Sequence, residues 1–224
     1  MFEVDLQPDL GFPEELAERY RPHSLDEFIG LADVKKVMAK YVARPYPTSW
    51  IFLGPPGVGK TCMGLFLAEI LNAELHHMTA QSFKVDELQR IRTTCQYLPN
   101  RSFAPNPELP CKFHLVLTDE VNLGSPDAQN KALSYLDGTD PAPSTIWVWT
   151  CNETRTLHER FLSRSKVLNF TVPNDAVARH LGAIWVAETT VEASFARLAA
   201  IATNSSGNVR GALMSLETDF LMAA

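Results

Sequence analysis

The chain has 224 residues, of which 46% are hydrophobic, and its formal net charge is -6 at pH 7. This length allows one large domain or two small ones with a sizeable core. The acidic balance excludes a global basic field for nucleic acid, so any such contact needs a local patch. Because the sequence has neither a signal peptide nor an apolar run near 18 residues, we expect a soluble intracellular protein, cytoplasmic or nuclear, with no membrane partner.

Helices and strands alternate along most of the chain. Residues 1–24 contain Pro8, Pro13 and Pro22 and are predicted to be irregular, and Ser24 followed by Glu27 gives a capping pattern. The patterns predict helices over 32–42, from 61 onward, and over 85–98, 126–136 and 156–163. They predict strands over 49–53, 74–79, 113–118, 145–150 and 166–170, with an irregular proline-rich loop before residue 112.

This alternation predicts an α/β fold, a parallel sheet covered on both faces by helices. After Pro173 the pattern changes, because three helical segments near 174–188, 192–203 and 208–222 follow with no strand among them. We therefore expect an N-terminal segment over 1–24, an α/β domain over 25–171 and a small all-α domain over 172–224.

A glycine-rich turn joins the strand that ends at Leu53 to the helix that begins at Thr61. The stretch "GPPGVGKT" over 54–61 fits the pattern G-x-x-x-x-G-K-[ST], whose backbone N–H groups form a concavity that suits a phosphate chain. Lys60 is then expected to bridge the β- and γ-phosphates of ATP, and the Thr61 hydroxyl to bind Mg²⁺. The expected nucleotide contacts in this loop are Gly54, Pro55, Pro56, Gly57, Val58, Gly59, Lys60, Thr61 and Cys62.

Polar residues end the next two central strands. "HLVLTDEVN" ends in Asp119 and Glu120, at the strand end where ligands of parallel sheets bind. Asp119 can hold Mg²⁺ through water, and Glu120 can polarise a water for attack on the γ-phosphate. Asn152 follows the strand "WVWTC" and can hold that water or the γ-phosphate, or can simply form a turn.

Two arginines occupy positions that suggest an anionic ligand. Arg210 lies in the first turn of a helix, where a cation gains nothing from the helix dipole, and Arg164 precedes an apolar strand. Solvated surface arginines are the alternative at both positions. Cys62, Cys95, Cys111 and Cys151 form no C-x-x-C pair, so reduced buried thiols are favoured over a metal site.

Taken in order, the motifs resemble those of AAA+ ATPases, and most closely the small ATPase subunits of sliding-clamp loaders of the replication factor C type. The resemblance runs from about residue 16 to 222. It rests on the segments "ERYRPHSLDEFIG", "GPPGVGKT", "VLTDEVN", "TCNE", "FLSRS" and "GNVRGAL".

The resemblance implies a role for each matching position. Asn152 would be sensor 1, and Arg210 would be sensor 2 on a helical lid. Arg164 would be an arginine finger that reaches the ATP of a neighbouring subunit. Lys84 and Arg90 match basic positions that track DNA phosphates, although a solvated helix face fits them equally. The residues that would line the adenine pocket are Tyr20, Arg21, Pro22, Phe28 and Ile29.

Several segments depart from the family pattern. The finger motif is Ser163-Arg164-Ser165 instead of Ser-Arg-Cys, and Asp119-Glu120-Val121-Asn122 replaces Asp-Glu-Ala-Asp, but the functional residues remain. "TAQS" over 79–82 replaces "NASD", which weakens the inference of DNA contact, and the four-cysteine zinc insert of bacterial loaders is missing. The sequence stops after the lid, before the family's collar domain, which indicates either a truncated chain or a different assembly.

The sequence therefore predicts an ATP- and Mg²⁺-dependent ATPase subunit of a DNA-acting oligomer, clamp-loader-like in DNA replication. Its expected partners are DNA and other AAA+ subunits in a ring or spiral, with a sliding clamp as a candidate. One alternative is a DNA-remodelling AAA+ ATPase of a phage or mobile element that assembles without a collar. Another is a nucleotide-binding subunit that hydrolyses nothing.

Overall fold

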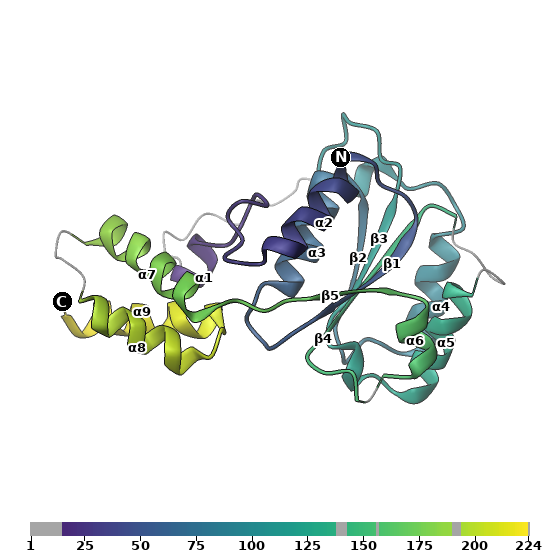
Figure 1. Ribbon diagram of the computed structural model, residues 1–224. Coiled ribbons are helices and arrows are strands. Elements are labelled where there is room, and N and C mark those ends of the chain that lie inside the picture. Colours follow the sequence, from purple (N-terminus) through teal and green to yellow (C-terminus); the bar gives the residue numbers. More distant parts are fainter. Residues whose placement is uncertain (1–14, 138–142, 156, 190–193, 224) are drawn as a thin grey trace.

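The computed structural model describes residues 15–137, 143–155, 157–189 and 194–223. Its centre is a five-stranded parallel sheet with the strand order β2-β3-β4-β1-β5 (Figure 1). The strands are β1 (Thr48–Leu53), β2 (Glu74–Met78), β3 (His114–Thr118), β4 (Thr145–Cys151) and β5 (Lys166–Asn169). The order places the strand that precedes the glycine-rich turn between β4 and β5, so three strand ends meet around that turn.

Helices cover both faces of the sheet, as the sequence predicts (Figure 1). One face packs on α2 (Ala32–Ala43) and α3 (Lys60–Ile70), and the other on α4 (Val85–Thr94), α5 (Pro126–Leu136) and α6 (Glu159–Ser163). Successive strand residues alternate between the two layers: Leu115 and Leu117 join the α3 layer, and Val116 joins the α4 layer. The central strands β1, β3 and β4 are buried along almost their whole length, which explains why their sequences are largely apolar.

Three longer helices follow the sheet and lie to one side of it, at the left of Figure 1. They are α7 (Asn174–Glu188), α8 (Phe195–Ser205) and α9 (Val209–Ala223), and the short helix α1 (Leu16–Arg19) packs against α9. Apolar residues at helical spacing, among them Leu181, Leu198 and Leu216, form their shared core. None of the helices in the described part of the chain is both long and apolar enough to cross a membrane.

The predicted elements differ from the observed ones mainly at their ends. The helix expected over 85–98 ends at Thr94, and a 3₁₀ turn, η1 (Arg101–Phe103), lies in the loop expected to be irregular. A second 3₁₀ turn, η2 (Val121–Leu123), follows β3. The irregular prediction for 1–24 is wrong for α1, and residues 1–14 lie outside the described part. Residues 156, 192 and 193, which two predicted helices include, lie outside it as well.

Ser24 and Glu27 bond each other in the structure, but not as a helix cap. The Ser24 hydroxyl donates to Glu27 at 2.9 Å, and the backbone N–H of His23 donates to the same carboxylate at 2.8 Å. Helix α2 begins only at Ala32, after Gly30 and Leu31, which have φ angles of 61° and 52°. The left-handed turn at these two residues redirects the chain before the helix starts.

Candidate functional site

The glycine-rich turn has the backbone conformation that its motif requires. Gly57 and Gly59 have φ angles of 74° and 92°, in the left-handed region that glycine adopts without a steric penalty. A Cβ on Gly57 would lie 1.8 Å from Oδ1 of Asn208, at the start of α9. The glycine therefore serves two purposes: it makes the turn, and it lets the C-terminal helices approach the turn closely.

A cavity of about 690 Å³ opens beside this turn. It is lined from four sides: the segment before α2, the glycine-rich turn, the carboxyl ends of β3 and β4, and the start of α9. Gly54 and Pro55 are the two predicted nucleotide contacts that do not line it. The predicted residues that line it are Tyr20, Arg21, Pro22, Phe28, Ile29, Pro56, Gly57, Val58, Gly59, Lys60, Thr61, Cys62, Asp119, Glu120, Asn152 and Arg210.

Lys60 is held by the turn itself and by β4. Its Nζ donates to the carbonyl oxygens of Gly54 and Pro55, each at 2.7 Å, and to Oδ1 of Asn152 at 2.9 Å. Burial lowers the pKa of Lys60 below its usual value, although nearby acidic groups oppose this effect. Three acceptors satisfy the ammonium group, so a phosphate oxygen entering the cavity would replace neutral acceptors with a charged one.

Asp119 receives three hydrogen bonds at the end of β3. Thr61 donates to its Oδ1 at 2.7 Å and Thr150 at 3.0 Å, while Nε2 of His77 donates to its Oδ2 at 2.7 Å. Burial alone would raise the pKa of Asp119, but these hydrogen bonds outweigh it and lower the pKa below its usual value. The ionised carboxylate beside the Thr61 hydroxyl is an oxygen donor pair of the kind that Mg²⁺ prefers.

Glu120 has a backbone conformation that is unusual for a residue with a side chain. Its φ and ψ are 52° and 48°, in the left-handed region, and its N–H donates to the Thr150 hydroxyl at 3.1 Å. Such a conformation costs free energy, on the order of 1 kcal/mol or more, and is concentrated at functional sites. It turns the chain sharply after β3 and leaves Glu120 lining the cavity beside Asp119.

The C-terminal helices meet the turn through the start of α9. The N–H of Arg210 donates to the carbonyl of Gly57 at 3.2 Å, and Oδ1 of Asn208 caps the helix by accepting from Gly211 N–H at 2.9 Å. Arg210 thus lies in the first turn of a helix, as predicted, and lines the cavity. A second contact joins the C-terminal helices to the segment before α2: the Tyr20 hydroxyl donates to Glu188 of α7 at 2.7 Å.

Three predicted site residues lie away from the cavity. Arg164 follows α6 and forms an ion pair with Asp137 at the end of α5. Arg90 forms an ion pair with Glu87 on the exposed side of α4 at 2.6 Å, and Lys84 precedes that helix. These three side chains do not contribute to the cavity of their own chain.

The sequence analysis did not identify several residues of the site. Thr150 and His77 bond Asp119, and Leu213 of α9 lines the cavity. His77 could have been found, because β2 pairs in parallel with β3 and its carboxyl end therefore lies at the same edge as Asp119. No motif indicates Leu213, since only the packing of α9 over the turn brings it there.

The sequence is similar to those of known proteins. The chain is 29% identical over 203 residues to replication factor C small subunit 2 of Pyrobaculum aerophilum, covering 89% of this chain and 62% of that protein. It is 24% identical over 221 residues to the replication factor C small subunit of Haloarcula marismortui, covering 97% of this chain and 66% of that one. The chain therefore spans somewhat less than two thirds of the length of these relatives.

The structure is also similar to solved structures. The RuvB Holliday junction branch migration motor of Thermotoga maritima matches with a TM-score of 0.71 at 22% identity, covering 91% of this chain and 67% of that one. At this identity the likeness shows the shared fold. The sequence model of the ATPase family associated with various cellular activities (AAA) matches residues 50–172, which include the glycine-rich turn, both strand-end carboxylates and Asn152. With more than half of its length matched, the chain belongs to the AAA family of ATPases.

Proposed function

We propose that this chain binds ATP with Mg²⁺ and hydrolyses it as a subunit of a DNA-acting oligomer, with a clamp-loader-like role in DNA replication. The observation that carries the proposal is that one cavity gathers a P-loop, two strand-end carboxylates, Asn152 and Arg210 from separate parts of the chain. The replication factor C relatives support the clamp-loader-like role.

The residues around the turn fit a nucleotide. Backbone N–H groups of the turn and the start of α3 would hold the phosphates, and Lys60 would exchange the carbonyls of Gly54 and Pro55 for phosphate oxygens. Thr61 and Asp119 would hold Mg²⁺, which when bound neutralises phosphate charge. The adenine would lie toward Tyr20 and Phe28, beneath the helices α7–α9, which we propose form a lid over 172–224.

Hydrolysis requires a group that activates water and groups that stabilise the charge of the transition state. Glu120 lines the cavity and would accept a proton from the attacking water. Asn152 already bonds Lys60 and would orient the γ-phosphate or that water. Arg210 would contact the phosphates from the lid side.

Arg164 would complete the site of a neighbouring subunit. Its side chain does not line the cavity of its own chain and instead pairs with Asp137 on the surface. An arginine that serves catalysis from this position must do so in trans, which requires an oligomer. We propose other AAA+ subunits as those partners, inside the cell, with a sliding clamp as a further candidate.

The decisive experiment for the enzymatic proposal compares Lys60→Ala and Glu120→Gln with the wild type. Lys60→Ala should lose nucleotide binding, because it removes the cation that meets the phosphates. Glu120→Gln should bind a fluorescent ATP analogue normally and hydrolyse ATP about 10² to 10⁴ times more slowly, because an amide cannot accept the proton.

Lys36→Ala, on the exposed side of α2, is the matched control and should behave as the wild type. Wild-type turnover in Glu120→Gln would reject this carboxylate as the base. Binding without hydrolysis in the wild type, at any protein concentration, would favour the non-hydrolysing alternative.

DNA contact through Lys84 and Arg90 is a separate proposal. Exposed cations at the start and on the surface of α4 can meet phosphates without reading bases. We expect ATP-dependent binding that weakens steeply with salt, and a lower salt slope in the double variant Lys84→Glu with Arg90→Glu. The same reversal at Lys36 and Lys40 on α2 is the control, and sequence-selective, salt-independent binding would contradict the proposal.

A further inference from the structure

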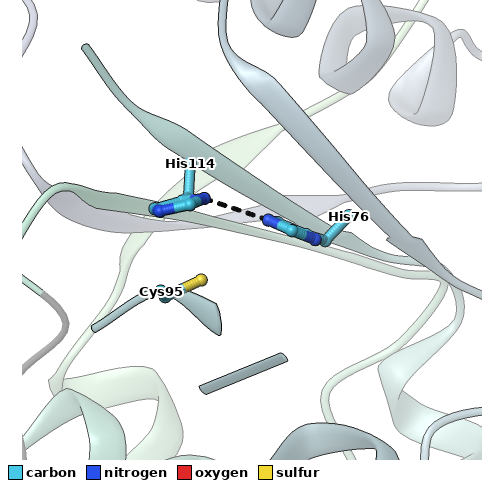
Figure 2. A group of neighbouring side chains, drawn as sticks. All are labelled: His76, Cys95 and His114. Carbon is cyan, nitrogen blue, oxygen red and sulfur yellow. Dashed lines mark hydrogen bonds between the residues drawn. The ribbon is translucent and has the colours of Figure 1, made fainter. Parts of the chain in front are cut away.

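A second group of side chains gathers on the α4 face of the sheet, at the start and middle of β2 and the start of β3. Glu74 and His76 are two residues apart, so their side chains project from the same face of β2. His114 on β3 is the register partner of Glu74. All three therefore project toward the layer that contains Cys95, the residue after α4. In Figure 2 the two imidazole rings face each other, and the Cys95 sulfur points toward the space between them.

The donor atoms of this group are spaced as metal ligands are. His76 Nε2 and His114 Nδ1 lie 3.0 Å apart, and the carboxylate oxygens of Glu74 lie 3.7 Å and 3.4 Å from them. One ligand atom each of His76, Cys95 and His114 lies within 4.8 Å of the others. Ligands bound tetrahedrally at about 2.0 to 2.3 Å have donor atoms roughly 3.3 to 3.8 Å apart, so small shifts would suffice.

One imidazole is already oriented to bind. Nε2 of His114 donates to the carbonyl of Tyr97 at 3.0 Å, which leaves Nδ1 of the neutral ring with a lone pair directed at His76. Metal-binding histidines commonly donate their other N–H to a backbone carbonyl in this way. His76 would transfer its proton from Nε2 to Nδ1, so that both rings present lone pairs to the same point.

The charge balance also favours a cation. Glu74 is only 5% exposed, and its described ion pairs are with the two histidines. Within the described part of the chain, its carboxylate accepts one further hydrogen bond, from the N–H of Asn100 to Oε2 at 2.7 Å. A buried carboxylate is costly unless a cation or several donors compensate it, and neutral imidazoles do so weakly.

We propose that Glu74, His76, Cys95 and His114 form a binding site for Zn²⁺ or a similar transition metal ion. A thiolate with two imidazoles is a donor set that selects such ions over Mg²⁺. The Cys95 thiol would lose its proton to the solvent as the sulfur–metal bond forms. The His76 side chain is 12% exposed and provides the side from which the ion enters.

The site would be structural and separate from the nucleotide cavity. His114 begins β3 and Asp119 follows its end, so the two lie roughly 16 Å apart at about 3.3 Å per residue. His76 and His77 are neighbours on β2, but their side chains project from opposite faces of the sheet. The proposed ligands belong to β2, β3 and the end of α4, and they bond the backbone of Tyr97 and Asn100. A bound ion would therefore fasten the loop after α4 to the edge of the sheet.

The test is a titration of the reduced, nucleotide-free chain with Co²⁺ alone. A tetrahedral thiolate site gives a sulfur-to-cobalt charge-transfer band and strong visible absorption, whereas the oxygen ligands at Thr61 and Asp119 give neither. We expect one such Co²⁺ per chain, displaced by Zn²⁺. Cys95→Ser should lose the charge-transfer band, and His76→Gln should weaken binding about tenfold or more.

Cys111→Ser is the matched control, because Cys111 is partly buried and lies near β3 without belonging to the cluster. It should bind Co²⁺ as the wild type does. The proposal is overturned if the folded wild type gives no thiolate band, if the band survives in Cys95→Ser, or if it is lost in Cys111→Ser. Should Cys95→Ser fail to fold, unchanged affinity in His76→Gln, which changes the least buried ligand, would overturn it as well.

Discussion

The two ends of β2 and β3 use the same kinds of side chain in different ways. At the carboxyl end, His77 donates to Asp119 beside an open cavity, and Asp119 also bonds Thr61 at the start of α3. Toward the amino end, His114 at the start of β3 and His76 in the middle of β2 bond each other and neighbour Glu74 in a group that solvent hardly reaches. The carboxyl end is therefore open to the cavity, whereas the group toward the amino end is enclosed by protein.

This difference follows from how each end is assembled. The carboxyl ends of the parallel strands lead into turns, and the turn at 54–59 offers backbone N–H donors. These donors come from consecutive residues of one segment. At the amino ends, side chains must come from separate strands and a helix, so their approach depends on strand register. A site of the first kind leaves a motif in the sequence, and one of the second kind does not.

The largest expected effect tests whether the proposed ATPase site needs Arg164 from a neighbouring subunit. Arg164→Ala should reduce ATP hydrolysis about 10³ to 10⁵ times, because an arginine finger stabilises the charge of the transition state. Activity per subunit of the wild type should rise with protein concentration. A mixture of Arg164→Ala and Glu120→Gln should regain activity, since some interfaces pair an intact Glu120 with an intact Arg164.

Arg160→Ala, four residues earlier along the same segment, serves as the control and should stay near the wild-type rate. Activity that is independent of concentration, or a mixture no more active than its two components, would show that Arg164 does not act in trans.

An intermediate effect tests whether the two ends are energetically independent. At about 100 times its Kd, a ligand that binds only the folded chain adds about 2.7 kcal/mol, or roughly 5 to 10 °C in Tm for a chain of this size. Zn²⁺ and MgATP should each give such a shift, and the two should add, because the two groups share no side-chain partner among the described residues and His76 and His77 point to opposite faces of the sheet.

The two variants Cys95→Ser and Lys60→Ala separate these shifts. The first should lose the Zn²⁺ shift and keep that of MgATP, and the second should do the reverse. Thermal unfolding followed by circular dichroism is the measurement. If either variant loses both shifts in Tm, the proposed metal and nucleotide sites are coupled, which contradicts their independence.

The smallest effect concerns the ion pair that holds Arg164 in its own chain. Asp137 and Arg164 have side chains that are 35% and 31% exposed, and pairs of this kind contribute about 0.2 to 1 kcal/mol. Asp137→Asn should release the arginine and raise ATPase activity at low protein concentration by up to about fivefold. Asp175→Asn, which breaks the exposed pair with Arg179 on α7, is the control; lower activity in Asp137→Asn would mean that the pair assists catalysis.

Local patterns predicted most of the elements because their signals are short-range. Helix α5 has its predicted bounds, since Ser125 accepts from Ala128 N–H as a cap and Pro126 occupies the first turn. The same reasoning was misleading at Ser24, whose hydroxyl donates to Glu27 in a turn and caps no helix. The roles assigned to Arg164, Lys84 and Arg90 remain predictions, because they concern partners outside a single chain.

The sequence by itself determined the glycine-rich turn, the strand-end residues and the alternation of strands and helices, because each is encoded by neighbours along the chain. Tertiary structure decided that Lys60 bonds Asn152, that His77 joins Asp119, and that α9 lies against Gly57. It also decided the cluster of Glu74, His76, Cys95 and His114, whose spacing follows no motif. Parallel pairing of β2 with β3 and the packing of α4 on them bring these donors together, and such non-local contacts become defined only when the sheet forms.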